Sequence, residues 1–286
     1  MEMPDRSGGA DPYERLARKG LAAYGLADAE ISLLSHKERI VFSVIDDGPN
    51  GREVYALRIG GREESKKQLL RESLFLEELR RDLLLDVPEP VLTRNGEIYR
   101  SVSTPGVPGF RLVSLFRWVG GRHLSVEEWT IDLARAVGRM IGEIHLASEG
   151  FDWPDELAPE DRSGDPIPPF PGGLSPKKQE ELEGMAELAT GAIGSLADDR
   201  KAHGVIHGSL TPEHILFSSS GIGAIGFSSC RYGYYPYDLA TVAAVVLEPL
   251  REGLVAGYRE VRNLNPELLP GFIALRRLEL LARRRA

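Results

Sequence analysis

The sequence predicts an α+β fold of two lobes, with antiparallel β-strands in the first lobe and mainly helices in the second. Three observations support this prediction. Short apolar segments typical of strands fill residues 30–60, a single amphipathic segment at 63–84 has helical spacing, and helical periodicity prevails after residue 125. A chain of 286 residues can form one large domain or two lobes.

The β-rich lobe is expected at residues 25–118, after a flexible N-terminal arm and lead-in helix at 1–24. Strands are expected at 30–34, 39–47 and 53–60, with GPNG at 48–51 as a hairpin turn. The segment 63–84 places apolar residues on one helix face and charges opposite, and the prolines of DVPEPVL end it. Two strands near 98–102 and at 111–119 complete this lobe.

Residues 119–286 are expected to form the helical lobe. Its helices are predicted at 125–148, with Ser125 as N-cap, and at 176–199, 236–248, 250–262 and 270–285. Two short strands, HILF and GAIGF, joined through SSSGI, belong to the same lobe. The Pro-rich acidic loop 150–176 holds seven prolines, and its stretch 152–165 has six carboxylates against one arginine. We interpret that stretch as solvated and mobile, with attraction of a cationic small molecule as the alternative.

Composition excludes several classes of function. The net charge of −8 argues against a nucleic-acid partner. The longest apolar run is far below the roughly 20 residues that cross a bilayer, so no membrane partner is expected. The N-terminus has no apolar segment of a secretory signal, which predicts a cytoplasmic protein. The single cysteine, Cys230, excludes an intramolecular disulfide and a cysteine-built metal cluster.

Three motifs are interpreted as structural. GIGAIG at 221–226 matches G-x-G-x-x-G, but no helix follows it, so it is predicted to be a hairpin turn and not a dinucleotide site. Ser209 lies beside His207 without the nucleophile elbow of a hydrolase. His145, near a helix end, is expected to be packed or capping.

Six segments in order resemble those of the aminoglycoside phosphotransferase superfamily, with choline kinase and type II homoserine kinase. They are YALRIG, LLRESLFLEEL, LFRWVGGRHL, HGSLTPEHILF, GAIGF and RYGYYPYDLA, within about residues 25–260. The resemblance implies a bilobal, protein-kinase-like fold with ATP between the lobes. It implies that Arg58 contacts the α- and β-phosphates, that Glu72 pairs with Arg58, and that Arg117, Trp118 and Val119 form the hinge beside adenine.

Every departure from the family pattern falls on a chemical position. Members read H-G-D-x-x-x-x-N, whose aspartate accepts a proton and whose asparagine holds magnesium. Here His207 is kept, but Ser209 and His214 stand at those two places, and Gly226 replaces the metal-binding aspartate of the next strand. Serine is a very weak base, glycine offers no ligand, and imidazole suits zinc or copper better than magnesium. No catalytic position is therefore intact, and no metal site is expected.

The turn between the first two strands, where members have glycine, has none between Leu33 and Phe42. Asp238 matches the family's structural aspartate at a helix start, and we expect it to be an N-cap.

These substitutions favour a catalytically inactive pseudokinase that acts by binding an unknown small molecule or a protein. No cofactor is expected. The one exception that the sequence leaves open is binding of ATP without magnesium. The alternative is an active ATP-dependent phosphotransferase for an amino alcohol or aminoglycoside with unorthodox metal ligands, such as a transition metal on His214. A third interpretation is an interaction module whose cleft is filled by its own side chains.

Overall fold

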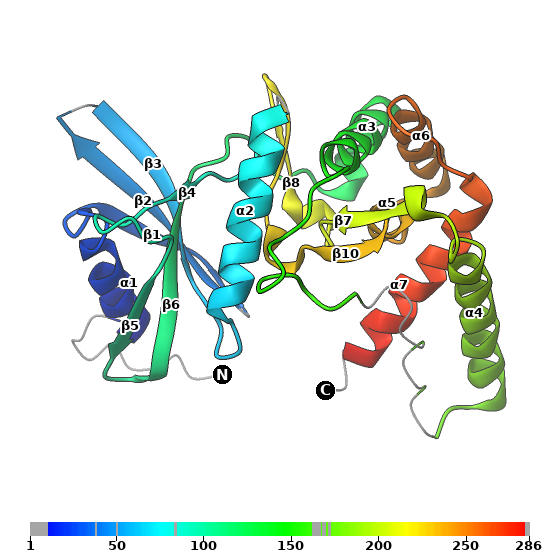
Figure 1. Ribbon diagram of the computed structural model, residues 1–286, viewed down its shortest axis with the longest axis horizontal. Coiled ribbons are helices and arrows are strands. Elements are labelled where there is room, and N and C mark those ends of the chain that lie inside the picture. Colours follow the sequence, from blue (N-terminus) through cyan, green and yellow to red (C-terminus); the bar gives the residue numbers. More distant parts are fainter. Residues whose placement is uncertain are drawn as a thin grey trace. The chain divides into compact units, whose positions relative to one another are not determined.

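A computed structural model describes residues 11–283 except 38, 50, 83–84, 162–166, 168–169 and 171–172. Most of the predicted flexible arm and part of the acidic loop thus lie outside the described residues. The chain divides into two compact units (Figure 1). Unit 1 comprises Met1–Ser73 and Pro88–Trp118, and unit 2 comprises Leu74–Val87 and Val119–Ala286.

Unit 1 is built on a six-stranded antiparallel sheet with the order β1-β2-β3-β6-β4, and β5 pairs with β6. Its strands are β1 (Glu30–His36), β2 (Ile40–Gly48), β3 (Gly51–Ile59), β4 (Pro90–Val91), β5 (Arg100–Thr104) and β6 (Val107–Arg117). The β2–β3 hairpin closes with Gly48 paired to Gly51, which confirms the predicted turn. Helix α1 (Pro12–Ala22) packs on β5 and β6 and buries Leu16 and Leu21 in the core of the sheet.

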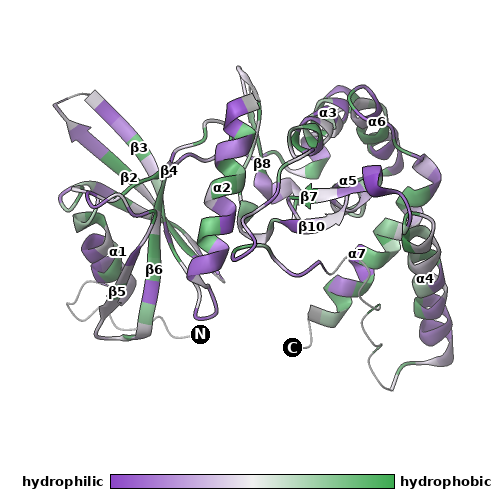
Figure 2. Cartoon of the chain, viewed as in Figure 1, coloured by the Kyte–Doolittle hydropathy of each residue, from purple (hydrophilic) through white to green (hydrophobic). Residues whose placement is uncertain are grey.

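Helix α2 (Lys66–Asp82) confirms the long amphipathic helix of the first part of the chain. Both hydrophobic and hydrophilic residues occur along its length (Figure 2). Leu69, Phe75, Leu76 and Leu79 are buried. The boundary between the two units falls within this helix, after Ser73.

Unit 2 is mainly helical. Its helices are α3 (Ile131–Ala147), α4 (Pro176–Gly194), α5 (Pro236–Ala243), α6 (Glu248–Arg259) and α7 (Leu269–Arg283). Two small antiparallel ladders accompany them: β7 (His203–Ile206) with β10 (Arg231–Tyr234), and β8 (Ile215–Ser218) with β9 (Gly221–Ala224). Short 3-10 turns lie at Val126–Glu128, Arg200–Ala202, Pro212–His214, Phe227–Ser229 and Pro266–Leu268. Among the described residues, none of the helices has the length and apolar character needed to cross a membrane.

The helix predicted at 125–148 is interrupted. Ser125 precedes a 3-10 turn, and its backbone N–H donates to the Glu128 carboxylate at 2.8 Å. Trp129 then adopts an extended conformation, and Thr130 caps α3 by accepting from the Leu133 N–H at 3.2 Å. Two capping signals five residues apart therefore start two elements, where periodicity alone indicated one.

Three short strands, β4, β7 and β10, were not predicted, because strands of two to four residues carry too little periodicity to recognise. The predicted helix 236–248 ends at Ala243, and α6 begins at Glu248. The G-x-G-x-x-G match proves to be a hairpin, since Gly221 pairs with Ser218 at the β8–β9 turn.

Helices α3 and α6 run side by side in unit 2 (Figure 1). Their backbones approach closely at several glycines, most tightly at Gly257 and Gly138. A β-carbon added at Gly257 would overlap the carbonyl oxygen of Arg135, and one added at Gly138 would overlap that of Leu254. Packing at backbone contact leaves no room for side chains at these positions.

Gly257→Ala should therefore lower the free energy of unfolding by about 1–3 kcal/mol, because the new methyl group meets backbone that cannot move cheaply. Gly191→Ala on the exposed face of α4 is the matched control, since no described atom lies within 4 Å of its added β-carbon. The control should be neutral or stabilising by up to about 1 kcal/mol. Urea denaturation of both variants measures the difference, and equal stabilities would contradict the close approach.

Candidate active site

The loop that follows β7 has a tightly fixed backbone. His207 is fully buried, and its Nε2 donates to the carbonyl oxygen of Ile225 at 3.0 Å. Its Nδ1 accepts from the backbone N–H of Ser209 at 3.3 Å. Gly208 has a φ of +76°, and a β-carbon there would overlap the carbonyl oxygen of Ser229. A neutral histidine and an obligatory glycine thus shape the turn.

The carboxylate of Asp238 on α5 holds the backbone of this turn through hydrogen bonds. It is 1% exposed, and its two oxygens accept from the backbone N–H groups of His207 at 2.7 Å and Gly208 at 2.9 Å. The Nε2–H of His145 also donates to it at 3.2 Å, and the Nδ1 of His145 lies 3.0 Å from the Tyr258 hydroxyl. The carboxylate is therefore shared by one loop and two helices.

The expectation that Asp238 is an N-cap is wrong. The N-cap position of α5 is Tyr235, and Asp238 lies in the first turn of the helix. Its carboxylate instead serves the backbone of a loop about 30 positions earlier. His145 behaves as expected, packed within α3 with no exposed surface.

The pKa values in this network follow from burial and pairing. Burial alone would raise the pKa of Asp238, but the hydrogen bonds that His145 and the Gly208 N–H donate to it hold this pKa below its ordinary value. Burial lowers the pKa of His145, and Asp238 only partly offsets this effect. Burial likewise lowers the pKa of His207. Asp238 is thus the charged member of a group whose histidines are neutral near pH 7.

The three substituted positions lie together in unit 2. The Nδ1 of His214 donates to the carbonyl oxygen of Ser209 at 2.8 Å. Gly226 has a φ of +84°, and a β-carbon added to it would lie 2.7 Å from the Nε2 of His214. The imidazole ring therefore occupies the space that any side chain at position 226 would need.

These residues do not fit magnesium. Magnesium prefers an octahedron of oxygen ligands, whereas this cluster offers one hydroxyl, one imidazole nitrogen and a glycine. No group of three or more histidine, cysteine or acidic side chains that could hold a metal ion occurs among the described residues. Burial, followed by the nearby His207, lowers the pKa of His214 to about 4, so this imidazole is neutral at pH 7. Its one unprotonated nitrogen faces Gly226, and in the part of the chain that the structure describes His214 belongs to no group of three potential metal ligands.

Arg58 on β3 and Glu72 on α2 form the expected ion pair within unit 1. The Nη1 and Nη2 atoms of Arg58 donate to the two carboxylate oxygens of Glu72 at 2.8 and 2.5 Å. Both residues are buried, and the ring of Phe116 lies 4.9 Å from the guanidinium carbon. A role of this pair in nucleotide binding remains a prediction.

The residues predicted as an adenine hinge differ in exposure. Arg117 pairs with Glu53 at 3.1 Å and with Glu89 at 3.4 Å. Trp118 is 42% exposed, while Val119 is buried. Contact of these three residues with a nucleotide also remains a prediction.

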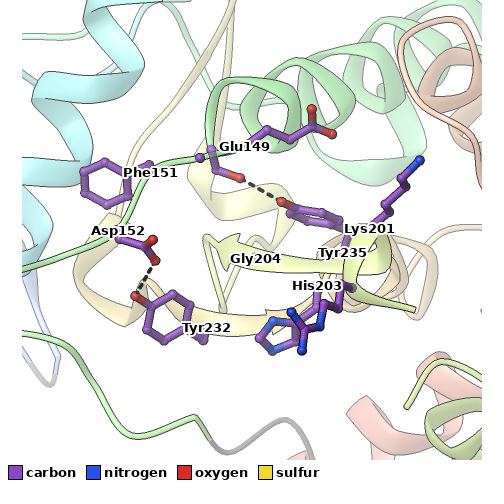
Figure 3. Close-up of a pocket in the computed structure, with 11 residues that line it drawn as sticks. Glu149, Phe151, Asp152, Lys201, His203, Gly204, Tyr232 and Tyr235 are labelled. Atoms are coloured by element: carbon purple, nitrogen blue, oxygen red, sulfur yellow. Dashed lines mark hydrogen bonds between the residues drawn. The ribbon is translucent and has the colours of Figure 1, made fainter. Parts of the chain in front are cut away.

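A pocket of about 530 Å³ in unit 2 was not found by motif reasoning (Figure 3). It is lined by Ser148, Glu149, Gly150, Phe151, Asp152, Arg200, Lys201, His203, Gly204, Tyr232 and Tyr235. The Tyr232 hydroxyl donates to Asp152 at 2.9 Å, and burial together with this bond raises the pKa of Tyr232 to about 12. The only sequence signals were the aromatic-rich segment RYGYYPY and the acidic loop.

The described part of the acidic loop, residues 152–161, is not wholly solvated as expected. Trp153 is buried, with its ring 5.2 Å from that of Tyr232. Asp161 lies 3.2 Å from the imidazole of His203. Aromatic packing and hydrogen bonds thus hold this stretch against the β7–β10 ladder, which the composition of the loop did not reveal.

Comparison with known proteins identifies the family of this chain. Residues 37–271 match the phosphotransferase enzyme family. The chain belongs to this family. The expected family and the α+β, protein-kinase-like fold are thus confirmed.

One known sequence and two solved structures illustrate what this phosphotransferase-family chain is similar to. The homoserine kinase of Gluconobacter oxydans (strain 621H) is 26% identical over 201 residues, which span 63% of this chain and only 58% of that relative. The structure of a microcompartment-associated aminopropanol kinase matches with a TM-score of 0.77 and 26% identity, covering 94% of this chain and 88% of that one. An amicoumacin kinase, solved with AMP-PNP and Ca2+, has a TM-score of 0.67 and 18% identity over 88% and 81% of the chains, and shows the fold alone.

The stability of this family member should fall as the pH drops below about 6.5, the ordinary histidine value. His145, His207 and His214 have lowered pKa values in the folded chain, so the unfolded chain binds more protons in that range. For His214 the effect spans the interval from 6.5 down to about 4. His214→Asn should flatten the pH dependence by up to about 1.4 kcal/mol per pH unit. Urea denaturation at several pH values measures this slope, and an unchanged slope would contradict the assignment.

Gly226→Asp alone should destabilise the chain by about 1–3 kcal/mol, because the new side chain meets the ring of His214. The double variant His214→Asn with Gly226→Asp should recover at least about 1 kcal/mol of that loss. Gly96→Asp is the control for backbone strain, since Gly96 has a φ of +78° and no described atom lies within 4 Å of its added β-carbon. Additive effects of the two changes in a double-mutant cycle would refute the steric coupling.

Proposed function

We propose that this chain does not catalyse magnesium-dependent phosphoryl transfer and acts instead by binding a ligand or a protein partner. The observation that carries the proposal is the position of the His214 ring in the space beside Gly226. A metal-binding side chain at 226 and this ring exclude each other. The substitutions at 214 and 226 are therefore one rearrangement and not two independent losses.

The loss of a general base supports the same proposal. Base catalysis is typically worth about 10²–10⁴-fold, and the hydroxyl of Ser209 is too weak a base to supply it. Electrostatic stabilisation of the phosphoryl group is the larger contribution in this chemistry, and it depends on bound cations. Ser209, His214 and Gly226 bring no carboxylate with which to hold such a cation.

The scaffold of the site, in contrast, is complete. Asp238 still holds the backbone of His207 and Gly208, and His145 still supports Asp238. A protein that has a costly buried carboxylate for the shape of its loop, but only the weak hydroxyl of Ser209 at the place of the base, is suited to binding rather than catalysis.

A binding function needs a place for the ligand, and the pocket beside Tyr232 and Tyr235 is the candidate in unit 2. Its volume of about 530 Å³ falls within the roughly 300–1,000 Å³ of small-molecule sites. Acidic Asp152 and Glu149 line it together with basic Arg200 and Lys201. A small polar molecule carrying both charges fits this lining better than an apolar one.

The alternative is an active kinase for the hydroxyl group of an amino alcohol. The similarity to a homoserine kinase and to an aminopropanol kinase, each at 26% identity, favours this alternative. It requires a base other than Ser209, such as the exposed Glu213 beside His214, and an unorthodox way to bind the metal.

Two measurements separate these functions. We expect no magnesium-dependent thermal shift with ATP, and no magnesium-dependent transfer to amino alcohols, aminoglycosides or Ser/Thr peptides. An active aminopropanol kinase assayed in parallel is the positive control. Robust magnesium-dependent turnover by the unchanged chain would contradict the proposal. Loss of this turnover in the Glu213→Gln variant would support the alternative.

A further inference from the structure

A buried carboxylate lies beside two arginines within unit 1. Glu64 belongs to the segment between β3 and α2, and its side chain is 2% exposed. Its Oε1 accepts from the Nε of Arg39 at 2.9 Å and lies 3.9 Å from the Nη2 of Arg58. Arg39 comes from the turn between β1 and β2, and Arg58 comes from β3. Three separate segments thus meet at one carboxylate.

This carboxylate is only half satisfied. Its Oε2 is buried and has no hydrogen-bond partner among the described residues. Leaving an acceptor oxygen of a charged group without a partner is costly, so the position must be stabilised mainly by the two arginines. Gly60 makes the position possible, because a β-carbon on this residue would overlap the Oε2 of Glu64.

The role of Glu64 follows from the charges of the residues around it. Glu72 already binds Arg58 through both of its oxygens. The two arginines with Glu72 alone would carry a net charge of about +1, and Glu64 brings the group to neutrality. Two guanidinium groups that converge on one carboxylate are suited to bind a phosphate group in its place, since phosphate oxygens match their geometry.

We propose that Glu64 occupies an anion site formed by Arg39 and Arg58 and thereby keeps phosphate-bearing ligands out of it. The carboxylate is the internal substitute for the anion. Displacing it opens the site. This inference deepens the proposed function and rests on it, because it takes the chain to bind phosphate-bearing ligands without turning them over. Its test measures binding alone.

Glu64→Gln in the full chain tests this inference, with magnesium-free ATP and inorganic pyrophosphate as separate probes in isothermal titration calorimetry. Removing the buried negative charge should tighten binding by at least about tenfold relative to the unchanged chain. Glu63→Gln is the matched control, since Glu63 is the exposed neighbour and loses the same charge. Adding Arg39→Met to Glu64→Gln should abolish the gain. A gain with both probes indicates a phosphate site, and a gain with ATP alone indicates a nucleotide site.

Gly60→Ala opens the site by a second route, because the new methyl group displaces the Glu64 carboxylate and leaves every charge in the chain. It should also tighten binding of both probes. If either variant is destabilised, pyrophosphate should restore its melting temperature. Three results would each overturn the proposal. The variants could be folded and bind the probes no more tightly than the unchanged chain, or their gain in affinity could equal that of Glu63→Gln. The third result is a destabilisation that pyrophosphate does not reverse. Turnover assays on the same samples report on the proposed function separately.

Discussion

The helical unit depends on one buried carboxylate. Asp238 is almost completely shielded from water, yet it remains charged because two backbone N–H groups and His145 donate to it. A buried charge with incomplete partners would cost several kcal/mol, so the loop, α3 and α5 must keep their positions together. The shape of the loop at residues 207–214 is therefore determined by its bonds to the buried core.

The backbone of this loop is therefore held independently of the side chains at positions 209, 214 and 226. None of the hydrogen bonds of Asp238 described above involves Ser209, His214 or Gly226. His214 instead contributes to local packing, since its ring fills the space beside Gly226 and its Nδ1 closes the turn on Ser209. The imidazole is thus a packing element of this loop.

The sheet unit shows the same preference for internal partners. The guanidinium of Arg58 binds Glu72 with both terminal nitrogens, and Glu64 adds a second carboxylate near it. Ion pairs with such short, paired contacts in a buried setting are not exchanged readily for solvent or ligand. The guanidinium group of Arg58 is therefore compensated from within the chain.

Much of this protein could be predicted from its residues. Alternation along the first strands, the GPNG hairpin, the amphipathic α2 and the order of motifs determined the fold class and the family, because local periodicity and turn chemistry act over a few residues. The departures from the family pattern at 209, 214 and 226 could also be read from the sequence, and their effect on catalysis stays a prediction. Tertiary structure alone decided that Asp238 bonds a distant loop rather than capping its own helix. It also decided that His214 fills the space at Gly226, that Glu64 faces two arginines, and that Tyr232 and Asp152 line a pocket. These are contacts between segments far apart in the chain, and their energies depend on burial and on the approach of specific atoms, which no local pattern encodes.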